Sequence, residues 1–198
     1  MLKRVFDFLF SAVGLCILFP FFIFLALIIK LDSTGSVFFR QERVGLNGKV
    51  FHIHKFRTMT VSPVSQGLSI TVGNDPRITR VGHLLRKYKI DELPQLIDVF
   101  LGDMSLVGPR PEVPFYVAHY PSNIRQIVLS VRPGITDNAS IEFKDENMLL
   151  AKAIDPNEAY VKDILPIKLN FYVQYIQNQS FLGDIQIIFK TFKALLSR

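Results

Sequence analysis

The chain opens with a long run of apolar residues. Residues 8–29 carry no charged side chain and a single hydroxyl, Ser11. A helix over this run is about 33 Å long, close to the thickness of the hydrocarbon core of a bilayer. A secretory signal would have a shorter apolar stretch that ends in a small-residue cleavage site, whereas this run ends in Ile28-Ile29-Lys30-Leu31-Asp32. The pattern therefore predicts a membrane anchor over residues 1–31.

Pro20 lies near the middle of the apolar run. Proline removes one helical hydrogen bond and clashes with the preceding turn, so a kink is expected there. Basic residues lie on both sides of the run, with Lys3 and Arg4 before it and Lys30 directly after it. The positive-inside rule favours a cytoplasmic location for both flanks, which a kinked, re-entrant helix satisfies. A helix that spans the bilayer is the alternative, and these residues alone do not decide between the two.

The remaining residues, 32–198, are predicted to form one domain of mixed, mainly α-helical structure with a small β-hairpin. Residues 37–43 and 49–57 are β-like, and Asn47-Gly48 within residues 45–48 is a hairpin signal. Residues 60–75 are rich in turn formers and predict a mobile loop. Residues 108–111 predict a rigid, non-helical segment, because they contain two prolines. Helical patterns cover residues 77–89, 91–101, 113–130, 145–152 and 156–178.

Residues 181–196 form the last helical pattern, with apolar side chains on one face and Lys190 and Lys193 off it. Such a helix can lie in a membrane interface, or it can pack on the core of the domain. The pattern is compatible with both.

Composition narrows the class of protein. The chain has 198 residues, 49% of them hydrophobic, and a formal net charge of +6, and its mean hydropathy is positive at +0.28. A single cysteine excludes a disulfide scaffold and a cysteine-based zinc cluster. The basic excess indicates an anionic partner, which is a nucleic acid, a phospholipid or a phosphorylated small molecule.

Asp91 and Glu92 are the candidate catalytic residues. Proline is accepted only in the first turn of a helix, so Pro94 places a helix start close to Asp91. Helix N-termini favour phosphate, and Arg86 lies just upstream. Carboxylates at a phosphate site act as metal ligands or as a nucleophile that attacks phosphorus. The alternative is an ordinary acidic first turn that offsets the helix dipole.

Lys55, Arg57 and Arg110 are candidate phosphate-binding residues. On a strand, Lys55 and Arg57 share one face, which can grip a diphosphate. Arg110 stands between two prolines and is therefore stiffly presented. A solvated strand face and a structural salt bridge are the respective alternatives. The glycine motifs of P-loop and dinucleotide-binding proteins are absent from the sequence.

Five segments in order resemble the bacterial sugar transferases, the monotopic phosphoglycosyl transferases, in their minimal form. They are KFRTM at 55–59, NDPRITRVG at 74–82, DELPQ at 91–95, GDMSLVGPRPE at 102–112 and RPGIT at 132–136. The resemblance implies that Asp91 attacks the sugar-bearing phosphorus of a UDP-sugar, expels UMP and forms a phosphosugar-aspartyl ester. Undecaprenyl phosphate then takes the sugar phosphate. The resemblance also implies Mg²⁺ at Asp91, a supporting acid–base or electrostatic role for Glu92, and phosphate contacts from Lys55, Arg110 and Arg86.

The same resemblance implies a location. It places a re-entrant helix in the bacterial inner membrane, in contact with phospholipid, and the catalytic domain on the cytoplasmic face. Phosphate on the donor and on the lipid then accounts for the basic excess, and nucleic acid is not expected as a partner. Many members read Gly-Trp-Ala-Gln where this chain has Asp137-Asn138-Ala139-Ser140, and Asp where it has Asn170. These departures fall where contacts to the nucleotide-sugar are expected, so the sugar does not follow from the resemblance, and neither does the oligomeric state.

Two hypotheses from other classes compete with a transferase. A membrane-anchored phosphohydrolase would use the same carboxylates with water as the acceptor. A non-enzymatic, membrane-tethered binder of nucleic acid or anionic lipid would depend on the charge of +6 and would be indifferent to the substitution Asp91→Asn.

Overall fold

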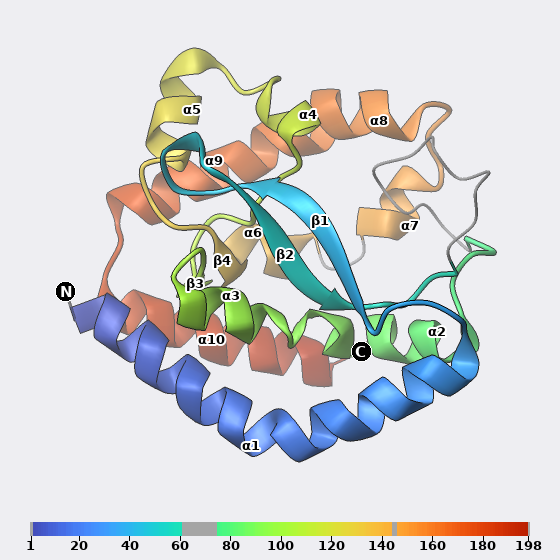
Figure 1. Cartoon of the computed structure of the whole chain (residues 1–198). Coiled ribbons are helices and arrows are strands. Elements are labelled where there is room, and N and C mark those ends of the chain that lie inside the picture. The colour runs from blue at the N-terminus through green and yellow to red at the C-terminus, as the bar shows by residue number, and fades with distance from the viewer. Residues whose placement is uncertain (1, 61–74, 144–145, 198) are drawn as a thin grey trace.

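The computed structural model describes residues 2–60, 75–143 and 146–197 of the chain, without the side chain of residue 147 (Figure 1). The described residues are mainly helical with two small sheets, which confirms the predicted mainly α-helical structure with a β-hairpin. The predicted loop at 60–75 lies almost wholly outside the described residues.

The apolar run forms one long helix, α1 (Leu2–Asp32), of 31 residues with Pro20 inside it. The helix bends near the middle of its length, as Pro20 predicts (Figure 1). By length and composition it can cross a membrane, and only 11% of its most apolar 18-residue window is buried. Most of its apolar surface is therefore uncovered by the rest of the chain.

Both ends of α1 are fixed to the rest of the molecule. At the N-terminal end the Lys3 ammonium donates to the Val107 carbonyl over 2.9 Å. At the C-terminal end the Val81 N–H donates to the Asp32 carboxylate over 3.2 Å. The inner face of α1 also contributes to the core, since Leu25 and Ile29 are buried. The boundary between an anchor at 1–31 and a domain at 32–198 stays a prediction, but the two pack together.

The predicted hairpin is confirmed. Strand β1 (Phe38–Val44) pairs antiparallel with β2 (Val50–Phe56), and Val44 faces Val50 next to the turn. Asn47 and Gly48 in that turn both have positive φ, 55° and 79°. Asn and Gly tolerate this left-handed conformation, which is why the pair is a hairpin signal.

The segment that carries the two carboxylates differs from the prediction. Helix α2 (Arg80–Lys87) begins at the Thr79 cap, because Ile78 is still extended and bridges to Met59. A 3₁₀ turn at Ile90–Glu92 and helix α3 (Gln95–Leu101) follow. The expected helix start close to Asp91 was therefore wrong by one turn, because the chain first tightens into a 3₁₀ turn before Pro94.

A second sheet was not predicted. Strand β3 (Ser105–Val107) pairs parallel with β4 (Gly134–Thr136), and each strand has three residues, too few for an alternating pattern to be visible. The backbones approach so closely that a Cβ on Gly134 would lie 2.1 Å from the Gly108 nitrogen. Only glycine fits at this crossing, which joins the two motifs that contain Gly108 and Gly134.

The other helices cover this framework. The region predicted at 113–130 forms two helices, because Pro121 starts a new one. The remaining elements are α4 (Pro114–Val117), α5 (Ser122–Val128), α6 (Asn138–Glu142), α7 (Glu146–Leu150), α8 (Pro156–Ala159), a π-helical turn (Tyr160–Ile164), α9 (Leu165–Gln177) and α10 (Phe181–Leu196).

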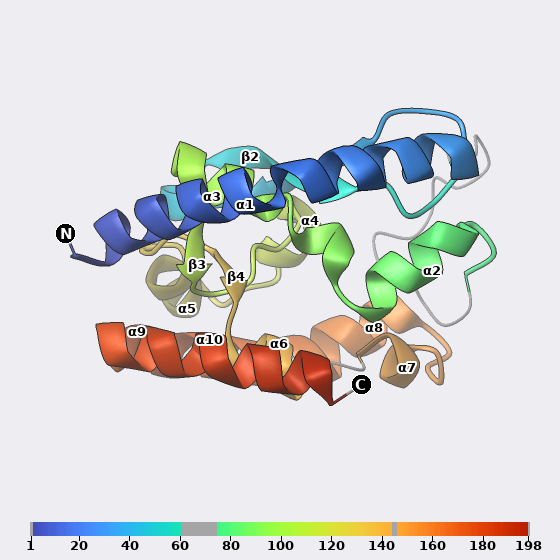
Figure 2. The same ribbon diagram turned by 90° about the horizontal axis from the view of Figure 1, so that it is seen from below.

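The molecule has an upper and a lower side in Figure 1. One apolar core is formed largely by residues of α4, α5 and α9. A second lies between the hairpin, α3, β3 and α10. Helices α2, α3 and α10 lie at one level, and α1 passes below them (Figure 1). Seen from below, α1 and α10 run across the same face (Figure 2). Helices α1 and α10, which both carry exposed large apolar side chains, thus lie on one side of the molecule.

Candidate active site

The two carboxylates are placed by an abrupt change in chain direction. Lys89, between α2 and the 3₁₀ turn, has φ 56° and ψ 22°, the left-handed conformation that non-glycine residues seldom adopt. Such a residue costs on the order of 1 kcal/mol or more and persists where the surroundings require it. The turn brings Asp91 and Glu92 inward, and each is only 8% exposed.

Glu92 is held by two cations from distant parts of the chain. The Lys55 ammonium donates to its Oε1 over 2.9 Å, and the Arg110 guanidinium donates to both oxygens, over 3.1 Å to Oε2. Burial alone would raise the pKa of Glu92, but Arg110 and Lys55 outweigh burial and hold that pKa well below its ordinary value. Glu92 is therefore a permanent carboxylate whose two oxygens are occupied.

Lys55 reaches Glu92 because of strand periodicity. Phe51, Ile53 and Lys55 point to the same side of β2, and the first two are buried in the core. The stem of Lys55 follows them inward. Burial lowers its pKa to about 8, although Glu92 works in the opposite direction.

Arg110 comes from the segment that follows β3. The Gly134 N–H donates to the Pro109 carbonyl over 2.9 Å, which fixes the residue before Arg110 against β4. Glu92 raises the pKa of Arg110 further above its ordinary value. The rigid segment predicted at 108–111 is confirmed as non-helical, and its guanidinium points to Glu92.

Asp91 has a different environment from its neighbour. Burial raises its pKa, and the nearby Glu92 carboxylate raises it further, against the effect of Lys55. Its Oδ1 is buried and has no hydrogen-bond partner among the described residues. A poorly solvated carboxylate with a free oxygen suits a nucleophile or a metal ligand.

Arg86 lies close to this carboxylate but is bonded elsewhere. Its Nε donates to the Thr58 hydroxyl over 2.8 Å. Burial lowers the pKa of Arg86, and Asp91 is the largest opposing influence on that pKa. The structure therefore brings Asp91, Glu92, Lys55, Arg110 and Arg86 together.

Arg57 is the exception among the predicted site residues. Strand β2 ends at Phe56, so Arg57 does not continue the face that carries Lys55. Its guanidinium donates to the carbonyls of Ile29 and Ser33, over 3.2 and 2.6 Å, at the C-terminal end of α1. The predicted common face of Lys55 and Arg57 was therefore wrong, because the chain leaves the strand one residue too early.

Two features of the site were not predicted. Asp98 accepts from the His54 N–H over 2.9 Å and contacts the His54 ring, which fixes α3 to β2. Gln95 is fully buried, at 1% exposed, and neither polar atom of its amide has a partner in the described parts of the chain. Gln95 belongs to the DELPQ segment, which was the only sequence signal for it.

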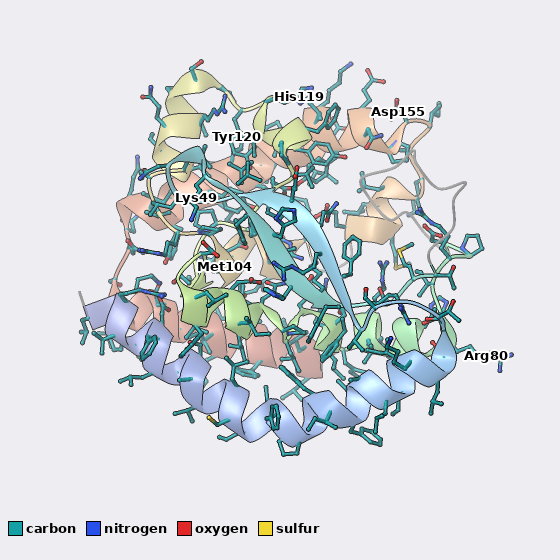
Figure 3. The ribbon with its side chains drawn as sticks, viewed as in Figure 1. Lys49, Arg80, Met104, His119, Tyr120 and Asp155 are labelled. Atoms are coloured by element: carbon teal, nitrogen blue, oxygen red, sulfur yellow. The ribbon has the colours of Figure 1, made fainter. Side chains whose placement is uncertain are left out.

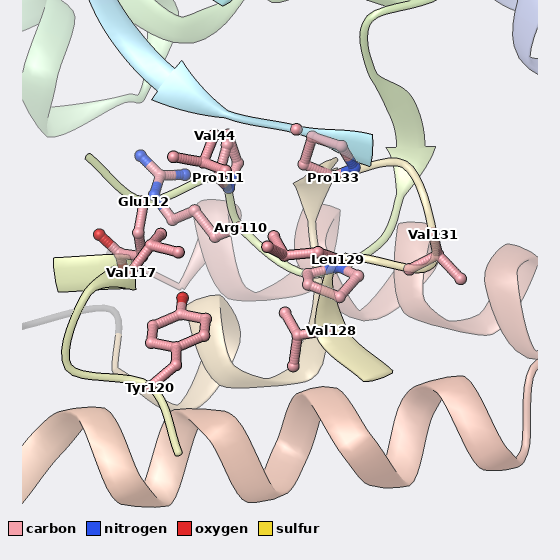
Figure 4. A pocket seen from close by; sticks show the side chains of 12 residues that line it. Val44, Arg110, Pro111, Glu112, Val117, Tyr120, Val128, Leu129, Val131 and Pro133 are labelled. Carbon is pink, nitrogen blue, oxygen red and sulfur yellow. The ribbon is translucent and has the colours of Figure 1, made fainter. Parts of the chain in front are cut away.

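A small cavity lies beside Arg110, between Glu112, Tyr120, Val128 and Pro133 (Figure 4). Its volume is about 10 Å³, room for no more than one water molecule. It is therefore too small for a nucleotide-sugar. Basic residues outside the site, such as Lys49 on the hairpin turn and Arg80 at the start of α2, project outward (Figure 3).

Comparisons with known proteins identify the family of the chain. The family model "Bacterial sugar transferase" matches residues 1–198 of the chain. The chain belongs to the bacterial sugar transferase family. This confirms the family that the five segments resemble.

Individual relatives of this sugar transferase cover the whole chain. It is 37% identical to the UDP-N-acetylgalactosamine-undecaprenyl-phosphate N-acetylgalactosaminephosphotransferase of Aeromonas hydrophila, over 99% of this chain and 44% of the relative. It is 36% identical to the UDP-glucose:undecaprenyl-phosphate glucose-1-phosphate transferase of Escherichia coli K12, over 100% of this chain and 41% of the relative. It is 38% identical to the exopolysaccharide production protein PSS of Rhizobium leguminosarum bv. phaseoli, over 100% of this chain and 96% of the relative. The chain therefore spans less than half of the first two relatives and nearly all of the third.

Proposed function

We propose that this sugar transferase moves a sugar 1-phosphate from a UDP-sugar to undecaprenyl phosphate and releases UMP. The observation that carries the proposal is the unequal environment of the two adjacent carboxylates. Glu92 has both oxygens occupied by Lys55 and Arg110, whereas the buried Asp91 keeps an oxygen with no partner in the described residues. The names of the Aeromonas and Escherichia coli relatives supply the donor class, a UDP-sugar, and the acceptor, undecaprenyl phosphate.

The reaction proceeds in two displacements at one phosphorus. An Asp91 oxygen attacks the sugar-bearing phosphorus of the donor and forms a new P–O bond. The bond from that phosphorus to the bridging oxygen breaks, and its electron pair leaves with UMP. An oxygen of undecaprenyl phosphate then attacks the same phosphorus, and the electron pair of the Asp91–phosphorus bond returns to the carboxylate.

The neighbouring residues supply charge and position. Phosphoryl transfer depends mainly on positioning and on neutralising phosphate oxygens. Lys55 and Arg110 are locked in place by Glu92, so the role of Glu92 is electrostatic: it fixes two cations beside the reacting phosphorus. Arg86 is the third cation and is not paired with Glu92.

The residues at Asp91 fit a magnesium ion. The buried Oδ1 of Asp91 has no partner in the described part of the chain and is therefore available to a metal ion. The described residues contain no group of three or more His, Cys, Asp or Glu that could hold a metal ion, so the substrate would have to supply further ligands. Magnesium in such sites is held by one or two carboxylates and by substrate phosphates. Asp91 would be its protein ligand, and the ion would neutralise charge on the diphosphate.

We propose further that α1 is re-entrant and that the domain lies on the cytoplasmic face of the bacterial inner membrane, in contact with phospholipid. Both ends of α1 are bonded to the same domain, through Lys3 and Asp32, and the helix bends between them (Figure 1). A helix that crosses the bilayer would carry one of these ends to the opposite side. The basic residues Lys3, Arg4 and Lys30 at the two ends favour the cytoplasm.

The topology is tested by thiol labelling in cells. Cysteines replace Leu2 and Ser36 one at a time in a Cys16→Ser background, which removes the chain's own cysteine. A membrane-impermeant thiol reagent added outside spheroplasts should label neither position, and both should react after lysis. Labelling of one position in intact spheroplasts would establish a spanning helix and overturn the re-entrant one.

The product would be a polyprenyl diphosphate-linked sugar, the starting point of a bacterial glycoconjugate such as an O-antigen, capsule, exopolysaccharide or protein glycan. The name of the Rhizobium relative, an exopolysaccharide production protein, supports this place in a pathway. The sugar is left open, because Asp137 and Asn138 replace residues expected at its contacts.

The decisive experiment is a UMP-release screen across UDP-sugars with undecaprenyl phosphate and Mg²⁺. One donor should give UMP, and intact mass without the lipid should show a phosphosugar adduct on the enzyme. Asp91→Asn should abolish both, whereas Asp103→Asn, on the surface, should leave both unchanged. Steady UMP release without lipid would establish the phosphohydrolase instead, and no UMP or adduct with any donor would overturn the proposal.

A further inference from the structure

Gln95 is one of the most completely buried polar residues near the candidate active site. It is the first residue of α3 and is 1% exposed. Its Nε2 and Oε1 atoms are both buried, and no hydrogen-bond partner for either is found in residues 2–60, 75–143 or 146–197. Nearly all buried amide groups in folded proteins are hydrogen-bonded, so this residue requires an explanation.

The position of Gln95 relates it to the reacting carboxylate. It follows Asp91 by four residues and Glu92 by three, and all three lie in one helical segment, in which the 3₁₀ turn Ile90–Glu92 leads through Leu93 and Pro94 into α3. Asp98, three residues further on, is bonded through both oxygens to His54. Glu92 is bonded through both oxygens to Lys55 and Arg110.

Two buried polar groups of this helical segment thus remain without a partner in the described residues, Asp91 Oδ1 and the Gln95 amide. The fold itself gains nothing from the amide. Leucine or methionine would fill the same space without leaving a donor and an acceptor unpaired. Buried polar groups without a hydrogen-bond partner occur at functional sites, where the group binds a ligand.

A neutral amide side chain suits position 95 better than a cationic side chain does. A lysine or arginine next to Asp91 would pair with the carboxylate and reduce its nucleophilicity. A carboxamide carries two N–H donors and no charge, so it donates to a phosphoryl oxygen while Asp91 stays free to attack. Donors fixed in a water-poor site stabilise the charge that develops in the transition state.

We propose that Gln95 is a further catalytic residue, whose Nε2 donates to a non-bridging oxygen of the phosphoryl group that Asp91 attacks. This inference rests on the proposed function. During the step Asp91 gains a bond to phosphorus and UMP leaves with the electron pair of the broken P–O bond, while the amide keeps its protons and only donates a hydrogen bond.

The test compares two variants with a matched control. Gln95→Met keeps the length of the side chain and removes both polar atoms, and Gln95→Glu keeps the shape and replaces the donor with an oxygen. Leu96→Met is the control, because Leu96 is the adjacent buried residue of α3. Two readouts are measured: the melting temperature, and the single-turnover rate of adduct formation with the UDP-sugar that serves the wild type, without lipid.

Gln95→Met should melt at or above the wild-type temperature and form the adduct about 100-fold more slowly, the loss typical of one removed transition-state donor. Gln95→Glu should be slower still, because its carboxylate repels the phosphoryl oxygens. Leu96→Met should keep the wild-type rate. An unchanged rate in Gln95→Met, or a wild-type rate in Gln95→Glu, would overturn the inference.

A structural role is separated from a catalytic one by the same measurements. If Gln95→Met melts well below the wild type and Gln95→Glu keeps the wild-type rate, the amide supports the fold and the inference fails. The proposed function fails separately, because it requires the wild-type enzyme itself to form the adduct and to release UMP.

Discussion

At the scale of single residues, the charge state of Lys55 decides how the site responds to pH. Its ammonium is bonded to Glu92 over 2.9 Å, and burial lowers its pKa to about 8. Between about pH 8 and the ordinary value of 10.5 the unfolded chain binds this proton and the folded chain does not. The free energy of unfolding should therefore rise with pH across this window, even as the site loses a cation.

We expect UMP release to fall on an alkaline limb with an apparent pKa of about 8, as Lys55 loses its proton. In Lys55→Arg the side chain stays protonated throughout this range, so the limb should disappear. The measurement is kcat/KM against pH for the wild type, Lys55→Arg and the control Lys49→Arg, whose residue is exposed on the hairpin turn. A limb near pH 8 that persists in Lys55→Arg would mean that another group titrates.

At the scale of elements, α1 is both a membrane helix and part of the core. Asp7 in its first third is 2% exposed. Its carboxylate accepts from the Ser105 hydroxyl over 2.8 Å and from the Leu106 N–H over 3.1 Å, at strand β3. The carboxylate directly before the apolar run is therefore explained by a docking contact, and β3 leads directly to the segment that carries Arg110.

Asp7→Ala should lower the free energy of unfolding by about 2 kcal/mol, because it leaves the buried Leu106 N–H without its acceptor and leaves the Ser105 hydroxyl only the Val107 carbonyl. Asp103→Ala, which removes only a partly exposed ion pair with Lys49 at 3.7 Å, should change it by less than about 0.5 kcal/mol. Denaturant unfolding in detergent measures both. Equal stability of the two variants would show that the Asp7 contact does not hold α1.

The amphipathic pattern of helix α10 is compatible with packing on the core and with lying in a membrane interface, and its two faces differ in the structure. Ile187 and Asp184 on one side are buried, and this side packs on α6, β3 and β4. Leu182 and Phe189 on the other side are 72% and 70% exposed. The helix therefore packs on the core through one face and presents a second, apolar face that the rest of the chain does not cover.

At the scale of the whole molecule, α1 and α10 run across one side (Figure 2), and both helices carry exposed apolar side chains. The exposed side chains of α1 include Ile17, Phe19 and Phe24, and those of α10 include Phe189 and Phe192. Apolar surface on this scale is expected to contact another apolar phase. A bilayer that receives the bend of α1 would also meet the outer face of α10.

In lipid vesicles of phosphatidylethanolamine and phosphatidylglycerol, we expect an environment-sensitive fluorophore on Phe189→Cys to emit at shorter wavelength than on Gln186→Cys and to be quenched by lipid-attached quenchers. The same fluorophore on Gln186→Cys, which is exposed on the polar side of α10, should be quenched little. Both variants carry Cys16→Ser. Equal quenching at the two positions would show that α10 does not lie on the lipid surface.

The sequence by itself determined the elements whose signal is local. The apolar run and its proline specify a long bent helix, Asn47-Gly48 specifies the hairpin turn, and the amphipathic pattern gives α10 the same bounds that the structure has. Propensity and periodicity are properties of neighbouring residues, so they can be read along the chain. The five motifs likewise identified the family and contain four residues of the site, Lys55, Asp91, Glu92 and Arg110.

Only the tertiary structure decided how those residues divide their roles. Lys55 and Arg110 both bind Glu92 across long stretches of chain, which leaves Asp91 distinct from its neighbour. Arg57 turned out to hold the end of α1, and Gln95 proved to be buried without a partner in the described residues. Burial and pairing depend on which distant segments meet. The partner of a charged or amide side chain therefore cannot be predicted from the residues around it in the sequence.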